Sequence, residues 1–360
     1  MPLMKGSLSL ANIKKIDKSG MLEVLLNFPQ QCQDAFSIGQ RIEKLPEKRD
    51  FQKIIFVGVG GSAIGADLVR SYLYFTSNVP ITVVREYNLP KFADSQTLIF
   101  ISSYSGNTEE ALNAYSEAKE KGACIVVISS GGKLKERAQA DNFSFVGVPA
   151  GLPPRYALGF LSIIPLCVLS KLGLTEDIEA AVFNTVKVLE ELKTKNLNQQ
   201  IALKDNIAKF TAQKLYGKFP VIYSASINFD VVATRLRSQL NENSKCLALS
   251  NWFPESNHNE IMAWQFPKRL IKDTLVIMLK APALEARVNR RMEITKEVLR
   301  AQDVEVMEIF SHGQDLLSRI FSLIYIGDFI SFYLAILYGV DPAPTDKIDY
   351  LKKKIREFNA

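Results

Sequence analysis

Histidine is scarce in this chain of 360 residues, which contains only His258 and His312. The chain has no HExxH motif and no Cys/His cluster, so a zinc site is not expected. A magnesium site built from carboxylates alone stays open at this stage. The four cysteines lie far apart without a CxxC pair, and the apolar surroundings of three of them indicate buried free thiols in a reducing compartment.

Long hydrophobic runs are also few. The first 20 residues lack the apolar core of a signal peptide. Residues 156–170 are apolar but too short to cross a membrane, whereas residues 320–340 are long enough but carry Asp328 near the middle. A buried helix of a large α/β protein explains the second run better than a membrane span does. We therefore expect a cytoplasmic protein without a membrane partner.

An excess of charge of one sign is nearly absent. The formal net charge is +6, and the basic residues are scattered along the chain rather than gathered into a stripe. This distribution suits a small anionic substrate and disfavours nucleic acid as a partner. The apolar and charged fractions, 47% and 23%, are those of an ordinary globular protein.

Short β-rich runs alternate with helical segments from residue 53 onward. A helical stretch over residues 8–48 precedes them. The runs in the first half cover residues 54–59, 81–86, 97–103, 123–129 and 143–148. They are nearly continuous in Val, Ile and Phe, as strands buried on both faces are. Such alternation predicts a mostly parallel sheet flanked by helices.

The second half repeats this pattern, with runs over residues 219–226, 245–250, 273–279 and 304–309. The offset between the halves is roughly 165 to 180 residues, about the size of one α/β domain. We therefore predict two α/β domains. The first covers residues 1–180 and includes the N-terminal helices, and the second covers residues 181–360 and includes a C-terminal helix.

A glycine-rich loop follows the first predicted strand. Its sequence, residues 58–63, reads GVGGSA and fits the G-x-G-x-x-G/A fingerprint, with Glu86 ending the next strand at the expected distance. Alone, this match would indicate an NAD-dependent dehydrogenase, but a single match of this kind is weak. Its more general meaning is that glycines allow the backbone to approach a ligand at a helix N-terminus.

A serine-rich loop follows the run 97–103 and leads into a helix. Its sequence, residues 103–108, reads SYSGNT. Ser105 or Thr108 could simply cap the helix, as such residues commonly do. However, the three hydroxyls of Ser103, Ser105 and Thr108 are more than capping needs. Together with backbone N–H groups at a helix start, they predict a phosphate-binding nest that requires neither lysine nor metal.

The S-x-S-G-x-T loop resembles the phosphosugar-binding loop of sugar-isomerase (SIS) domains. The glycine loop lies upstream of it, at the position that such a loop occupies in SIS domains. Further segments resemble bifunctional phosphoglucose/phosphomannose isomerases: GLPPRYALG (151–159), LNENSK (240–245), PESNHNEI (254–261) and GVDP with LKKKI (339–355). The resemblance covers most of residues 50–355 in the same order. It implies two SIS domains, no cofactor, a homodimer, and interconversion of glucose 6-phosphate and mannose 6-phosphate with fructose 6-phosphate through an enediol(ate).

The resemblance also assigns the residues that hold the substrate. The phosphate is expected on Ser62, Ser103, Ser105 and Thr108, with Gly60 and Gly61 close beneath the sugar. Thr345 occupies a position associated in the family with admitting mannose 6-phosphate. Thr345 also fits an ordinary helix N-cap.

Glu242 lies at the end of a predicted helix over residues 230–242, where the negative end of the helix dipole disfavours an ionised carboxylate. Composition alone suggests a surface glutamate, but the resemblance makes Glu242 the base that moves the proton. Arg155, which follows two prolines, is expected to hold the negative charge of the enediolate.

Ring opening is assigned by the resemblance to His258 and Lys352, with His258 supplied across the dimer interface to the neighbouring subunit's site. Helical periodicity alone leaves Lys352 and Lys354 as equal candidates. Glu260 and His312 receive no role.

Three alternatives remain at this stage. A phosphosugar-binding regulatory protein would keep the phosphate loops without turnover. An isomerase of another sugar phosphate would share the serine loop without needing Glu242 and His258. A dehydrogenase would use the glycine loop to bind NAD.

Overall fold

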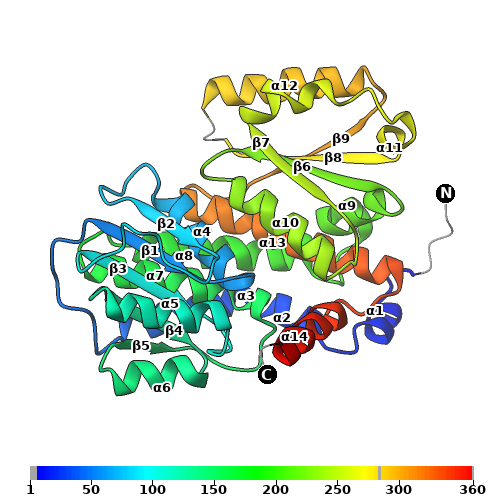
Figure 1. Cartoon of the computed structure of the whole chain (residues 1–360). Coiled ribbons are helices and arrows are strands. Elements are labelled where there is room, and N and C mark those ends of the chain that lie inside the picture. The colour runs from blue at the N-terminus through cyan, green and yellow to red at the C-terminus, as the bar shows by residue number, and fades with distance from the viewer. Residues whose placement is uncertain (1–5, 283–284, 359–360) are drawn as a thin grey trace.

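The computed structural model describes residues 6–282 and 285–358, and it contains two parallel β-sheets with helices between and around them (Figure 1). The strands are β1 (Lys53–Val57), β2 (Ile81–Val84), β3 (Thr97–Ser102), β4 (Cys124–Ser129), β5 (Ser144–Gly147), β6 (Phe219–Ala225), β7 (Leu249–Phe253), β8 (Thr274–Lys280) and β9 (Glu305–Phe310). The helices are α1 (Leu10–Ile16), α2 (Met21–Leu26), α3 (Phe28–Gln40), α4 (Gly61–Leu73), α5 (Glu109–Glu120), α6 (Gly132–Ala140), α7 (Leu158–Lys171), α8 (Glu179–Leu192), α9 (Ile207–Leu215), α10 (Asp230–Glu242), α11 (Lys268–Lys272), α12 (Ala286–Arg300), α13 (Leu316–Tyr338) and α14 (Asp346–Phe358).

The two sheets share one topology. The first has the order β2-β1-β3-β4-β5, and the second has the order β7-β6-β8-β9. The strand pairs in both sheets are parallel. Strand β6 therefore corresponds to β1 and β8 to β3, which confirms the predicted repeat of an α/β architecture. The division at residue 180 stays a prediction.

A helical layer lies between the two sheets. Helix α13 packs against α8, α9 and α10, and Figure 1 shows these helices crossing between the sheets. One continuous core joins the inner faces, since Phe56 and Phe100 of the first sheet belong to the same apolar cluster as Ile222 and Ile277 of the second. The outer faces carry separate clusters, covered by α5 and α6 on the first sheet and by α12 on the second.

Helix α13 is long and apolar enough to cross a membrane, and its most apolar window is entirely buried inside the protein. Its one acidic residue, Asp328, receives two hydrogen bonds from Arg235 of α10, at 3.1 and 2.7 Å, and a third from Gln239 at 3.0 Å. The helix is thus a core helix with a paired charge, as the position of Asp328 suggested. Burial raises the pKa of Asp328, although Arg235 opposes that effect.

Two parts of the secondary structure differ from the sequence prediction. The helical stretch predicted for residues 8–48 is divided into three helices and ends at Gln40. The strand predicted over residues 245–250 begins instead at Leu249. The reason is the end of α10: Lys245 adopts a φ of 54°, and the Cys246 N–H bonds the Leu240 carbonyl at 3.0 Å. The apolar run therefore begins by closing a helix before it joins the sheet.

Candidate active site

The glycine loop lies between β1 and α4 and is closely packed on two sides. A Cβ atom added to Gly61 would lie 2.6 Å from the Pro154 carbonyl oxygen and 2.9 Å from Cα of Arg155. One added to Gly58 would lie 2.9 Å from the Ser102 carbonyl oxygen, at the end of β3. The glycines therefore bring the N-terminus of α4 against both the serine loop and the segment that carries Arg155.

The serine loop joins β3 to α5 at the neighbouring strand end. The hydroxyls of Ser103 and Thr108 are 2.7 Å apart. Thr108 occupies the N-cap position of α5, but its side chain makes no capping hydrogen bond. The Thr108 hydroxyl therefore does not serve as a helix cap in this structure. Ser103 and Ser62 are almost fully buried, whereas Ser105 is exposed.

Glu242 is the last residue of α10, and its carboxylate lies 3.5 Å from the guanidinium of Arg155. Arg155 belongs to the 3-10 turn Pro154–Tyr156 and is 7% exposed. Its Nε donates to the side-chain oxygen of Asn243 at 2.9 Å. The Asn243 amide donates in turn to the hydroxyls of Tyr156 and Ser331, at 2.7 and 2.9 Å. This network holds the guanidinium in one orientation beside the carboxylate.

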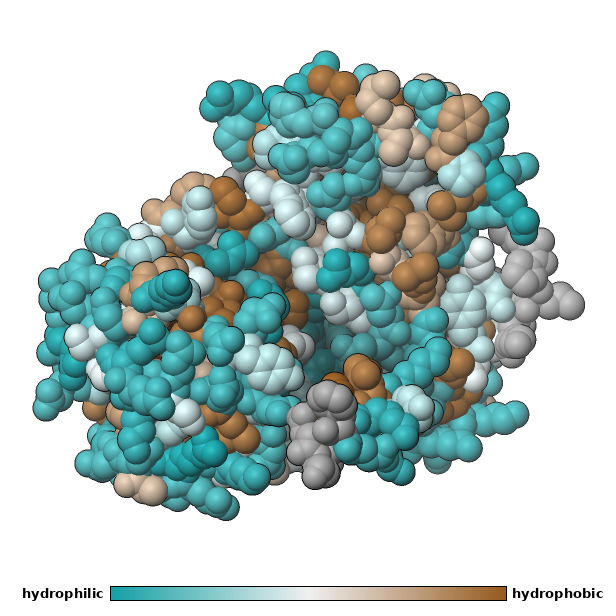
Figure 2. Space-filling view, viewed as in Figure 1, coloured by the Kyte–Doolittle hydropathy of each residue, from teal (hydrophilic) through white to brown (hydrophobic). Residues whose placement is uncertain are grey.

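A cavity of about 160 Å³ brings four predicted residues together: Gly60, Gly61, Arg155 and Glu242. Arginines 85, 235 and 237 also line the cavity, and Glu242 is the only acidic residue among the described residues that line it. Arg85 and Arg235 are paired with Asp67 and Asp328, so the lining carries a modest excess of positive charge, which suits an anionic ligand. The molecular surface is hollowed where the halves carrying the two sheets meet (Figure 2).

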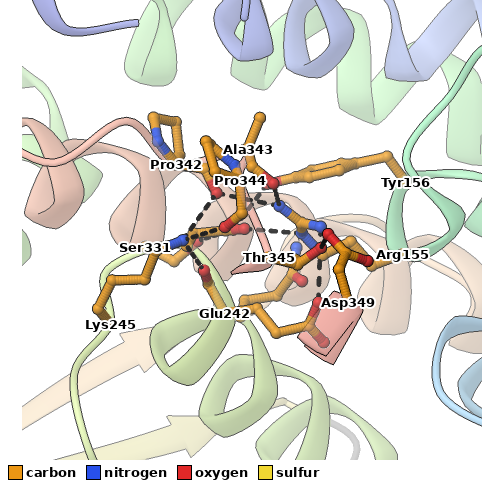
Figure 3. Close-up of polar contacts among 12 residues, drawn as sticks. Arg155, Tyr156, Glu242, Lys245, Ser331, Pro342, Ala343, Pro344, Thr345 and Asp349 are labelled. Atoms are coloured by element: carbon orange, nitrogen blue, oxygen red, sulfur yellow. Dashed lines mark hydrogen bonds and ion pairs between the residues drawn. The ribbon is translucent and has the colours of Figure 1, made fainter. Parts of the chain in front are cut away.

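Thr345 does not line this cavity and lies in the segment between α13 and α14, close to Arg155 (Figure 3). Figure 3 shows Arg155 reaching that segment, where its Nη2 donates to the carbonyls of Pro342 and Ala343 at 3.0 and 3.1 Å. The Thr345 carbonyl accepts the first hydrogen bonds of α14, from the N–H groups of Ile348 and Asp349. Thr345 therefore has the N-cap position directly before α14, in addition to lying close to Arg155 (Figure 3).

Two predicted catalytic residues do not reach the cavity. His258 ends the 3-10 turn Glu255–His258 that follows β7, and its side chain is exposed. Lys352 is exposed on α14, next to the apolar residues Ile348 and Leu351, which are also exposed. Neither residue lines the cavity with Glu242. The structure thus brings together the predicted base and the predicted cation, but not the two predicted ring-opening groups.

Several residues at the site carried no earlier assignment. Asn243 and Lys245 belong to the LNENSK motif, and their proximity to Glu242 is the signal that could have identified them. The two unassigned residues lie elsewhere. Glu260 accepts a hydrogen bond from the buried Tyr223 hydroxyl at 2.5 Å, whereas His312 lines a separate cavity of about 370 Å³ beside α8. Within the described parts of the chain, no three His, Cys, Asp or Glu side chains are grouped to hold a metal ion.

Solved structures similar to this fold define its class. A protein from Thermus thermophilus described as hypothetical has a TM-score of 0.75 at 15% identity, covering 97% of this chain and 93% of its own. The C-terminal domain of glucosamine-fructose-6-phosphate aminotransferase from Francisella tularensis has a TM-score of 0.66 at 15% identity, covering 90% and 97%. Residues 204–355 match the family model of the bacterial phospho-glucose isomerase C-terminal SIS domain. The chain thus has the two-domain SIS fold.

Sequence relatives narrow the class further. The bifunctional phosphoglucose/phosphomannose isomerase of Caldicellulosiruptor bescii is 44% identical over 339 residues, which are 94% of this chain and 99% of the relative. The enzyme of the same name from Aquifex aeolicus is 37% identical over 85% of this chain and 91% of its own. The chain belongs to the bifunctional phosphoglucose/phosphomannose isomerase family, and the resemblance inferred from its motifs is confirmed.

Proposed function

We propose that this protein interconverts glucose 6-phosphate and mannose 6-phosphate with fructose 6-phosphate, through an enediol(ate) and without a metal ion. The observation that carries the proposal is the Arg155–Glu242 pair beside the glycine loop. Family membership supports the same reaction. The phosphate binds to Ser62, Ser103, Ser105 and Thr108, and the sugar extends over Gly60 and Gly61 toward Glu242.

Glu242 removes the proton from carbon 2 of the open aldose and returns it to carbon 1. The hydroxyl proton moves from the oxygen of carbon 2 to the oxygen of carbon 1, so the carbonyl shifts to carbon 2 and the ketose forms. In the reverse direction, return of the proton to either face of carbon 2, after rotation about the carbon 2–carbon 3 bond, gives the two epimers. Arg155 stabilises the negative charge of the intermediate, and its fixed orientation means that little reorganisation is needed.

A homodimer forms part of the proposal, with His258 and Lys352 as the ring-opening groups. Strand β7 lies at the edge of the second sheet, and the segment around it exposes apolar side chains, among them Leu247, Leu249, Met262 and Phe266. An exposed strand edge with apolar neighbours favours contact with another chain. His258 follows β7 directly, so a dimer through this surface would carry it to a partner.

The trans arrangement of His258 predicts a specific pattern of activity in mixed dimers. A heterodimer of one Glu242→Gln subunit and one His258→Asn subunit contains one intact site and should show about half the wild-type activity. The two variant homodimers should each be nearly inactive. Differently tagged subunits, co-expressed and purified in two steps, provide the heterodimer, and turnover of glucose 6-phosphate is measured.

The reciprocal control places both substitutions in one subunit and leaves its partner wild type. That heterodimer should be nearly inactive, because each site then lacks one of its two groups. If His258 served the site of its own subunit, the two results would be exchanged, and the trans assignment would be wrong.

The proposed function is tested on the purified wild-type protein with EDTA present. Formation of fructose 6-phosphate is followed separately from glucose 6-phosphate and from mannose 6-phosphate. We expect turnover of both substrates and no loss of rate on chelation. A folded protein that converts neither sugar phosphate would be a binding protein instead, and stabilisation by NAD alone in a thermal-shift assay would favour a dehydrogenase.

A reducing, cytoplasmic location is also part of the proposal. All four cysteines are free, and Cys32 and Cys167 are buried. Burial raises the pKa of the Cys167 thiol to about 12, so the reactive thiolate is rare at that position. Free thiols of this kind suit a protein that does not depend on disulfides.

A further inference from the structure

The segment between α13 and α14 is held by two cations that bind three consecutive carbonyl groups (Figure 3). Arg155 donates to the carbonyls of Pro342 and Ala343. Lys245 donates to those of Pro342 and Pro344, at 3.4 and 2.7 Å. The next residue is Thr345, so the position of Thr345 depends directly on these contacts.

The composition of this segment explains why it needs such contacts. Pro342 and Pro344 have no N–H group and fixed φ angles, so the segment cannot continue as a helix or pair with a strand. Its carbonyl oxygens must therefore find other donors. The side chains of Arg155 and Lys245 supply them.

Lys245 makes a third contact that links the segment to the base. Its Nζ also donates to the main-chain carbonyl of Glu242 at 2.5 Å. That carbonyl lies at the C-terminus of α10, where helices leave acceptors without internal partners. The ammonium group has three N–H donors, and three carbonyls now accept from them. All three N–H donors of Lys245 thus bind main-chain oxygens, and none is left to bind a substrate.

The backbone at Lys245 is shaped for this role. Its φ of 54° is uncommon for a residue with a side chain, and it turns the chain at the end of α10. Partial burial and, as a smaller effect, the nearby Arg155 lower the pKa of Lys245.

We propose that Lys245 is a positioning residue that fixes Thr345 relative to Glu242 and thereby sets the relative turnover of mannose 6-phosphate and glucose 6-phosphate. This inference rests on the proposed function and on the role that the family resemblance gives Thr345 in admitting mannose 6-phosphate. The two aldoses differ only in the configuration at carbon 2, where Glu242 acts. A displacement of Thr345 by a fraction of an ångström therefore affects one epimer more than the other.

The test compares wild type with Lys245→Met, which keeps the length of the side chain but removes its donors. The values of kcat and KM are measured for both aldose phosphates. We expect the ratio of the two kcat values to change by about five- to tenfold, because catalysis depends steeply on small displacements. KM should change by less than about twofold, since the phosphate loops are untouched. Lys245→Arg restores donors and should recover most of the wild-type ratio.

A matched control and a structural readout accompany the kinetics. Lys48→Met, in the exposed segment before β1, removes an equal charge and should leave the ratio unchanged. Hydrogen–deuterium exchange over residues 339–358 should be faster in Lys245→Met than in wild type, because the carbonyl anchor is lost.

The outcomes separate this inference from the proposed function. If the wild-type protein converts neither sugar phosphate, the proposed function is wrong, and this inference is wrong with it. If the wild type is active and Lys245→Met keeps both the kcat ratio and the exchange rates, only this inference is wrong. Faster exchange together with an unchanged ratio also overturns it, since the lysine would then be merely structural.

Discussion

Replacing Glu242 with glutamine should lower kcat on both aldose phosphates by about 10²- to 10⁴-fold, the usual contribution of a general base. Glutamine has nearly the same shape, but its amide cannot accept and return the proton. Arg155 stays anchored through Asn243 and the carbonyls of Pro342 and Ala343, so the site keeps its form. Initial rates of fructose 6-phosphate formation provide the measurement.

Two further readouts make this result specific to proton transfer. Incorporation of solvent deuterium at carbon 1 of the fructose 6-phosphate formed should fall in parallel with kcat, whereas KM should change little because the phosphate loops are intact. Glu120→Gln, at an exposed position at the end of α5, is the matched control and should behave as wild type. If Glu242→Gln keeps most of the activity, another residue must act as the base.

Replacing Arg235 with methionine should lower the free energy of unfolding by about 3–5 kcal/mol, because it leaves the buried carboxylate of Asp328 without its partner. Arg235 and Asp328 are 3% and 2% exposed and make a two-point contact between α10 and α13. Gln239 alone donates one hydrogen bond to Asp328. Urea denaturation at a fixed protein concentration measures the loss.

The pH dependence of this variant has a definite sign. Burial already raises the folded-state pKa of Asp328, and loss of Arg235 raises it further. Below the unfolded-state pKa of about 4 both states are protonated, so the penalty is absent. Stability then falls as pH rises toward the folded-state pKa. The variant should therefore be closer to wild type in acid than at neutral pH.

A double replacement provides the control for this second prediction. Arg235→Met combined with Asp328→Leu removes both charges and should recover much of the stability, since an apolar pair needs no buried counter-charge. A loss below about 1 kcal/mol in Arg235→Met would mean that Gln239 and water satisfy the carboxylate without the arginine.

The strands of the first sheet were predictable because their residues are apolar on both faces. Each of the five predicted runs overlaps an observed strand, since parallel strands between two helical layers leave no polar face. The strand predicted over residues 245–250 starts before the observed β7, because the first residues of that run form the C-terminal turn of α10 instead. The local hydrophobic pattern does not distinguish an apolar residue in a strand from one in the turn that ends a helix.

The candidate site was predictable in part. Both loops were identified because each follows a buried strand, and adjacent parallel strands place such loops side by side. Arg155 and Glu242 required the family resemblance, since composition alone favours surface residues in both cases. His258 and Lys352 both lie outside the cavity, and their roles remain predictions.

The sequence by itself determined the two parallel sheets, the loops at their strand ends and the family to which the chain belongs. These features depend on local periodicity and on short motifs, which a single chain displays directly. Only the tertiary structure decided how Arg155 is held, because its partners Asn243 and Pro342 lie 88 and 187 residues away. The same holds for the pairing of Arg235 with Asp328. Contacts between segments without a shared period leave no trace in the order of residues, and they exist only after the helices between the sheets have packed.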